Sequence, residues 1–309
     1  MTLEDWRKRL RADPRATLAE LAQSLIESRA GEPGLEELFW RALADYGTPE
    51  ELARAVVGRL RIGPAAPSAE APELLDLDHE HRVRVHGQLR LAAAESLAGI
   101  VRDRAERERI EAHPALLPEV ALERRGRLAE AAALYALEHD LLPSRSRTRP
   151  GTAAEPLARA ALCYQLARAL HRVGDETVRA LAAMEGVLAL VEEARGRAGE
   201  DEEAASLPLR LSYHAREWLG LRHYEGGRYR DAVRQFLRAA EAAPDTDLEL
   251  AAGIFAANAL IRDRRQAEAR RLLDSLRERV SRVGSDLSEE WEAQLRKLTE
   301  AGPEEDDPG

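Results

Sequence analysis

The chain has 309 residues, of which 44% are hydrophobic, 33% are charged and only 4% are aromatic. This balance, rich in Ala, Leu, Glu and Arg, is typical of α-helices and argues against a β-sandwich. The formal net charge of −10 makes nucleic acid an unlikely general ligand, because phosphate contacts need a basic surface. The single cysteine, Cys163, excludes an internal disulfide framework and a cysteine-rich zinc site.

The sequence predicts a cytoplasmic protein that does not enter a membrane. Its first residues, MTLEDWRKRL, lack the apolar core of a signal peptide. No uninterrupted apolar run approaches the ~20 residues that a membrane span needs. The preference for Arg and Ala over Lys and Asn indicates a GC-rich genome, and we expect a bacterial source.

Residues 1–62 are predicted to form a small helical module. Two stripes at helical spacing consist of Leu18, Leu21, Ala22, Leu25 and Ile26, and of Leu35, Leu38, Phe39, Ala42 and Leu43. A third helix is expected to begin at Thr48-Pro49-Glu50-Glu51, which combines an N-cap residue, a proline in the first turn and early acidic residues.

Residues 63–72, GPAAPSAEAP, contain three prolines and no apolar stripe, and are predicted to be a linker. The chain is then expected to be helical over residues 73–300. Two polar interruptions, at 143–156 and 195–208, are predicted to be either inserted loops or lengthened helices. Residues 301–309, which are acidic and almost free of apolar side chains, are predicted to form a disordered tail.

The stretch from Trp218 to Pro244, WLGLRHYEGGRYRDAVRQFLRAAEAAP, has the pattern of two helices joined by a tight turn. Gly220 and Ala232 are the small residues expected to face each other where the helices meet. Gly226-Gly227 supplies a turn that needs positive φ, and Pro244 stops the second helix. The gaps between the small contacts are expected to be filled by Tyr224, Tyr229 and Phe236.

This stretch resembles a tetratricopeptide repeat, a helix–turn–helix unit of about 34 residues. Weaker copies are anchored at Ala131, Ala180 and Ala269, so the resemblance covers residues 112–283. The resemblance implies an all-α fold, in which a TPR-like α-solenoid of helical hairpins follows the N-terminal module. It also implies protein–protein interaction rather than catalysis.

Arrays of this family bind partners through a groove lined by the first helix of each hairpin. By spacing, the groove is expected to contain Tyr164, Arg168, His171, His214, Glu217, Leu221, Tyr224, Asn258, Ile261 and Arg262. For Tyr224, a wholly buried place in the core is an equal alternative. The family's carboxylate-clamp variety needs Lys and Asn at groove positions where this chain has Glu217, Leu221 and Ile254, so that activity is not expected.

Residues that could support catalysis or metal binding form no recognisable signature. The glycine-rich phosphate loops and the G-x-S-x-G motif are absent, and we expect neither an enzyme nor a cofactor. Asp78-His79-Glu80-His81, with His86 nearby, would place His79 and His81 about 200° apart on a helix, which prevents joint chelation of a metal. These histidines are expected to be solvated, and Cys163 is expected to be buried in a helical face.

The sequence therefore predicts a scaffold or adaptor that binds a peptide or helix of a partner protein whose identity it does not reveal. One alternative is a regulatory protein, in which the N-terminal module contacts DNA or a signalling partner while the repeats sense an input. A weaker alternative is an enzyme with an unrecognised site. A basic stripe on the module would favour the regulator, and a deep pocket with converging acids and histidines would favour the enzyme.

Overall fold

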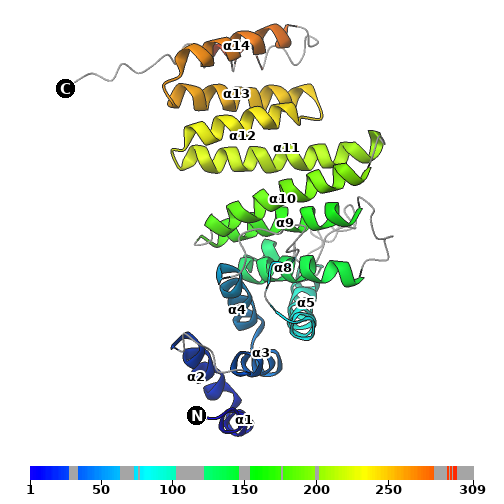
Figure 1. Cartoon of the computed structure of the whole chain (residues 1–309), viewed down its shortest axis with the longest axis vertical. Coiled ribbons are helices and arrows are strands. Elements are labelled where there is room, and N and C mark those ends of the chain that lie inside the picture. The colour runs from blue at the N-terminus through cyan, green and yellow to red at the C-terminus, as the bar shows by residue number, and fades with distance from the viewer. Residues whose placement is uncertain are drawn as a thin grey trace, which may run out of the picture. The chain divides into compact units, whose positions relative to one another are not determined.

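A computed structural model of the chain contains only α-helices as regular elements in the part that it describes, which confirms the all-α class (Figure 1). The described residues are 1–27, 34–62, 73–75, 77–101, 122–145, 154–174, 177–198, 202–281, 291, 293 and 295–297. The predicted linker (63–72) and tail (301–309) lie outside these ranges, so both stay predictions. Within the same ranges, none of the helices has the length and apolar character required to cross a membrane.

The contacts between residues divide the chain into two compact units. Unit 1 consists of Met1–Arg149 and Ala158–Gly186, and unit 2 consists of Pro150–Leu157 and Val187–Gly309. These bounds differ from the predicted domains at 1–62 and 73–300, because helices before and after the expected linker share unit 1.

The first three helices of unit 1 pack around a small apolar cluster, and a fourth helix follows them. They are α1 (Leu3–Ala12), α2 (Pro14–Glu27), α3 (Leu35–Tyr46) and α4 (Pro49–Ile62). Trp6, Leu21 and Leu35 form the buried centre of the cluster. As predicted, Thr48 caps the start of α4. The bonds form a capping box: the Glu51 N–H donates to Thr48 Oγ1 at 3.2 Å, and the Thr48 N–H donates to Glu51 Oε2 at 2.7 Å.

The later helices of unit 1 are α5 (His79–Val101), α8 (Leu128–Arg145), α9 (Ala154–Val173) from Ala158 onward, and the start of α10 (Thr177–Ala198), up to Gly186. Both α4 and α5 contact α8, and α4 also contacts α5. The N-terminal helices are therefore packed against the region that follows the expected linker.

Unit 2 has a series of helices, from α11 to α14, in which each packs against the next (Figure 1). It contains the end of α10 (Thr177–Ala198), then α11 (Glu202–Glu225), α12 (Tyr229–Glu241), α13 (Thr246–Arg262) and α14 (Gln266–Val280). The interruption at 195–208 is largely helical, because α10 continues to Ala198 and α11 begins at Glu202. At the other interruption, α8 continues to Arg145 and α9 begins at Ala154.

Three of the described turns between helices have the same backbone hydrogen bonds. Before α12, the N–H of Gly227 donates to the Tyr224 carbonyl at 3.0 Å, and the N–H of Arg228 donates to the His223 carbonyl at 2.9 Å. This pair of bonds defines a Schellman motif, in which the residue after the cap needs positive φ. The turns before α8 and α14 repeat it, and the positive-φ residues are Gly126 (73°), Gly227 (70°) and Arg264 (61°).

The residues that follow these turns occupy equivalent buried places. An alanine stands five positions after each positive-φ residue, and a large apolar residue stands nine positions after it. The alanines are Ala131, Ala232 and Ala269, and the large residues are Tyr135, Phe236 and Leu273. The burial of Ala232 is as predicted.

Gly220 of α11 does not face the residue of α12 that was predicted, which was Ala232. A Cβ placed on Gly220 would lie 2.5 Å from Cε1 of Phe236, so the glycine faces the phenyl ring rather than Ala232. Phe236 in turn stacks on Phe255, with ring centroids 5.3 Å apart. Gly220 therefore gives the Phe236 ring the space to enter the interface, because any side chain at this position would overlap the ring.

Candidate functional site

The predicted groove residues of α11 form one stripe along that helix. His214 is exposed, while Glu217, Leu221 and Tyr224 are half-buried. Glu217 accepts a hydrogen bond from the hydroxyl of Tyr213 at 3.2 Å, and its other oxygen lies 3.5 Å from His214 Nδ1. Glu217 is therefore partly committed to holding a buried tyrosine, and His214 is the polar group of the stripe that is most open to a partner.

The predicted groove residues of α13 are Asn258 and Ile261, which are half-buried, and Arg262, which is exposed. Ile261 packs against the same buried cluster as Leu221 and Tyr224 of α11. Tyr224 also makes an edge-to-face contact with Tyr229, with ring centroids 5.4 Å apart, so it is neither wholly core nor wholly surface. The seven predicted residues of unit 2 thus combine a partly exposed apolar fringe with one imidazole, one amide and two charged groups.

The remaining predicted residues, Tyr164, Arg168 and His171, lie on α9 in unit 1 and are considered apart from those of unit 2. Tyr164 and His171 are half-buried, and Arg168 is exposed. The guanidinium carbon of Arg168 lies 5.8 Å from the centroid of the Tyr164 ring, a cation–π distance. The role of these three residues as a partner surface stays a prediction.

A buried polar cluster in unit 1 was not predicted. It is centred on Asp140 of α8, whose side chain is 0% exposed. The two carboxylate oxygens accept the backbone N–H groups of Leu74 and Leu75, at 2.8 and 2.9 Å. Oδ1 also lies 2.8 Å from Nδ1 of His139, and Nε2 of His139 lies 3.3 Å from Nε of Arg159 in α9. The sequence carried one signal of this cluster, the charged residues 138–140 inside an otherwise apolar run.

Burial shifts the pKa of His139 in the cluster and of the nearby Cys163. Burial lowers the pKa of His139 below its ordinary value of 6.5, although the Asp140 carboxylate opposes this shift. Burial raises the pKa of the Cys163 thiol well above its usual range, so the thiol stays protonated and is a poor nucleophile. Cys163 is buried in α9, as predicted.

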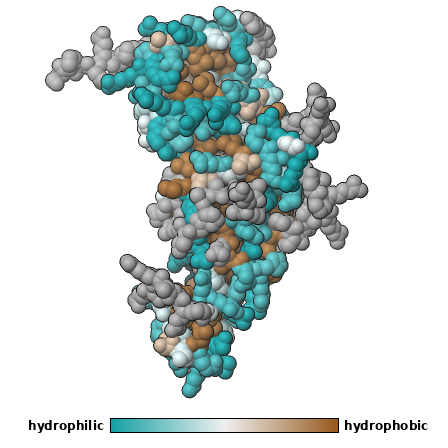
Figure 2. Space-filling model, viewed as in Figure 1, coloured by the Kyte–Doolittle hydropathy of each residue, from teal (hydrophilic) through white to brown (hydrophobic). Residues whose placement is uncertain are grey.

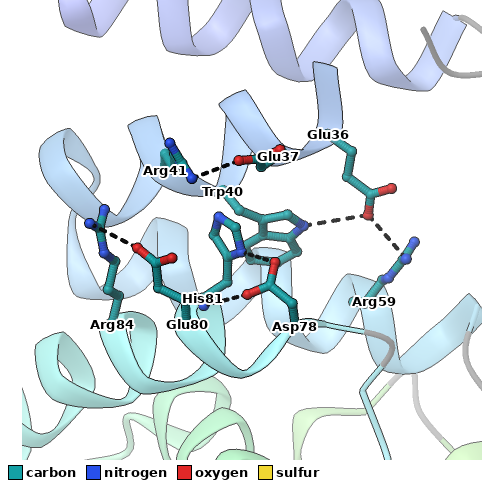
Figure 3. A network of polar contacts seen from close by, with 9 residues as sticks. All are labelled: Glu36, Glu37, Trp40, Arg41, Arg59, Asp78, Glu80, His81 and Arg84. Carbon is teal, nitrogen blue, oxygen red and sulfur yellow. Dashed lines mark hydrogen bonds and ion pairs between the residues drawn. The ribbon is translucent and has the colours of Figure 1, made fainter. Parts of the chain in front are cut away.

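The expectation that the histidines near residue 80 are solvated is wrong for His81 and His86, whereas His79 is exposed. The His81 N–H donates to Asp78 Oδ1 at 3.0 Å and its Nδ1 also contacts the Asp78 carboxylate, which places the pair at the start of α5 (Figure 3). His86 Nε2 lies 2.7 Å from Oε1 of Glu138 in α8. α5 contacts α3, α4 and α8, and its periodicity alone could not reveal which of its side chains these helices bury.

The α3–α5 region in Figure 3 is held by ion pairs and hydrogen bonds. Trp40 Nε1 donates to Glu36 Oε1 at 3.5 Å, and Arg59 of α4 pairs with the same carboxylate at 3.0 Å. Arg84 of α5 pairs with Glu80 at 3.2 Å. These contacts link α3 to α4 and support α5, and we assign them a structural role.

A cavity of about 690 Å³ in unit 1 contains none of the predicted groove residues. Its acidic lining residues are already paired: Glu50 with Arg54 at 2.5 Å, and Glu130 with Arg127 at 2.9 Å. No histidine lines it. Among the described residues, no group of three or more His, Cys, Asp or Glu side chains could hold a metal ion.

Comparisons of the chain with models of protein families, with curated proteins and with solved structures find no match. The tetratricopeptide resemblance therefore stays a prediction, drawn from the residues of this chain.

Proposed function

We propose that this protein is an interaction scaffold, built as a TPR-like α-solenoid, whose first helices bind a peptide or helix of a partner protein. The observation that carries the proposal is the recurring turn: the same Schellman hydrogen bonds precede α8, α12 and α14, each followed by a buried alanine and a buried large residue at the same spacing. Such repetition is typical of arrays of helical hairpins, in which each unit buries its apolar face against the next.

The character of the α11–α13 face supports a protein ligand. Leu221 and Ile261 retain partial exposure at the edge of a buried cluster, and His214 and Arg262 are exposed near them on the same two helices. A peptide or helix can bury apolar side chains on such a fringe and form hydrogen bonds with the flanking polar groups. Figure 2 shows hydrophobic side chains in patches between hydrophilic ones on one face of the molecule. The cytoplasmic, bacterial setting of the interaction stays a prediction from composition.

The proposal is tested by comparing matched charge changes on the first and second helices of unit 2. The groove variant combines His214→Glu in α11 with Arg262→Glu in α13. The control combines Arg238→Glu in α12 with Ala267→Glu in α14, which adds the same three negative charges at positions that are also exposed. Glu217 is left unchanged, because its carboxylate holds the Tyr213 hydroxyl.

Each full-length variant is first shown to melt like the parent, and the proteins that each retains from a lysate are then measured by quantitative mass spectrometry. We expect the groove variant to lose specific partners that the parent and the control retain. A groove variant that keeps every partner while the control loses one would place binding on the second helices and contradict the proposal.

A further inference from the structure

A short segment before α5 is bound to α8 through its backbone. We call Glu73, Leu74, Leu75 and Leu77 the strap. Its three leucines are buried, and the amides of Leu74 and Leu75 donate to the two oxygens of Asp140, which lies 65 or more positions later in the sequence. A carboxylate that accepts two consecutive backbone amides holds a bent segment in one position, independently of its side chains.

The hydrogen bonds around His139 require a neutral imidazole. Nδ1 donates its proton to Asp140, so Nε2 is the acceptor for the N–H of Arg159. A second proton on Nε2 would place two donors 3.3 Å apart and add a positive charge beside the guanidinium of Arg159. Since the His139 side chain is 0% exposed, the imidazolium could regain solvation only if the cluster opened.

From this geometry we infer that the strap is a latch released by acid: protonation of His139 detaches Leu74 and Leu75 from Asp140 and exposes the surface of α8 that they cover. The strap precedes α5, which contacts both α3 and α4, so its release loosens the attachment between the N-terminal helices and α8. The inference concerns unit 1 and is independent of the proposed partner surface.

The charged groups around the cluster determine the direction of the effect. Asp140 and, more weakly, Glu73 favour protonation of His139, while Arg159 opposes it. Arg82 of α5 lies 3.9 Å from Asp140 and 3.6 Å from Glu73, and offsets their charge. Burial outweighs the carboxylates, so the pKa of His139 in the closed state lies below its ordinary 6.5. The open state therefore binds more protons as the pH falls below 6.5, and acid favours opening.

Hydrogen exchange of the Leu74 and Leu75 amides in the full-length protein tests the latch. Their protection factors, corrected for the intrinsic pH dependence of exchange, are measured at about pH 7.5 and 5.5. If opening restores the ordinary pKa of His139, protection falls over this interval by up to about tenfold, the limit for a closed state that stays unprotonated at pH 5.5. In His139→Gln, whose side chain can keep both hydrogen bonds but does not titrate, protection should stay constant. The buried amide of Leu21 in α2 serves as the reference for general unfolding.

The outcomes are distinct. Constant protection in the parent overturns the latch, an equal loss in His139→Gln shows that another group is the sensor, and a parallel loss at Leu21 shows general acid unfolding instead. Should His139→Gln not fold, His139→Asn replaces it, because its amide does not titrate either. Constant protection in that variant supports the latch. A tenfold acid step in that variant contradicts it.

Discussion

The contact between Gly220 and Phe236 can be tested by adding a single methyl group. In Gly220→Ala, the new Cβ would lie 2.5, 2.7 and 2.9 Å from three carbons of the Phe236 ring, whereas carbon atoms in good contact are about 3.5–4.0 Å apart. The ring must therefore move by about 1 Å. It is 1% exposed and stacked on Phe255, so it cannot turn into solvent.

Two opposing effects set the size of the change. Overpacking of a buried site costs about 1–3 kcal/mol, and replacing glycine by alanine inside a helix returns about 0.5–1 kcal/mol. Taking the middle of each range, we expect Gly220→Ala to lower the free energy of unfolding by about 1 kcal/mol. Gly196 in α10 is the matched control, because a Cβ at this position has no neighbouring atom within 4 Å; Gly196→Ala should be neutral or stabilising.

The assay is urea unfolding of the full-length variants, followed by circular dichroism and tryptophan fluorescence. The double variant Gly220→Ala/Phe236→Leu should show a coupling free energy, since the shorter side chain removes the obstacle to the methyl group. If Gly220→Ala is as stable as the parent or more stable, while Gly196→Ala behaves as expected, the close packing of this interface is refuted.

Four further predictions follow from the same contacts. Ala232→Leu should destabilise unit 2 by about 1–3 kcal/mol in the same unfolding assay, because the alanine is completely buried; a melt identical to the parent's would contradict this. Gly227→Ala should cost about 1 kcal/mol at φ 70°, whereas Arg264→Gly, at φ 61°, should be neutral or stabilising; the reverse order in thermal melts would exclude the shared turn geometry. Burial and, to a smaller extent, Arg228 lower the pKa of His223, so the protein should lose stability as the pH falls below 6.5, where the unfolded chain binds a proton that the folded chain does not. In urea titrations, His223→Gln should lose less stability on acidification than the parent, and equal losses in the two proteins would count against this. Asp140→Ala should lower the free energy of unfolding by at least about 3 kcal/mol, because two backbone amides and His139 lose their acceptor. A change below about 1 kcal/mol would show that the cluster contributes little to stability.

The features that could be predicted from the sequence are those set by neighbouring residues. The N-cap at Thr48 and the positive φ of Gly227 depend on a few adjacent positions, and both are as expected. The equivalent turn at Arg264 carries no glycine, so its conformation became evident only from its hydrogen bonds. A turn can be predicted from neighbouring residues where the residue type indicates the backbone conformation, as glycine does for positive φ.

Features that depend on distant segments could not be predicted in the same way. The helical period of α5 indicates which residues share a face, but not that α5 packs against α3, α4 and α8 and that His81 and His86 are buried. Likewise, the charge at Asp140 marks an exception in an apolar run without identifying its partner, because the strap that satisfies it lies far away in sequence. The predicted groove was placed by spacing alone, and its binding role awaits the partner comparison.

Because of the strap, unit 1 depends on contacts between distant parts of the chain more than unit 2 does, and the two units should fold at different rates. In unit 2 the principal contacts join consecutive helices, so a hairpin can form soon after its turn closes and the next helix can add to it. In unit 1, the bonds of Leu74 and Leu75 to Asp140 close a loop of about 65 residues, whose entropy must be lost before the carboxylate gains its partners. We therefore expect unit 2 to refold faster than unit 1. During synthesis, the strap cannot bind Asp140 until α8 has left the ribosome, and the strap leucines stay exposed until then.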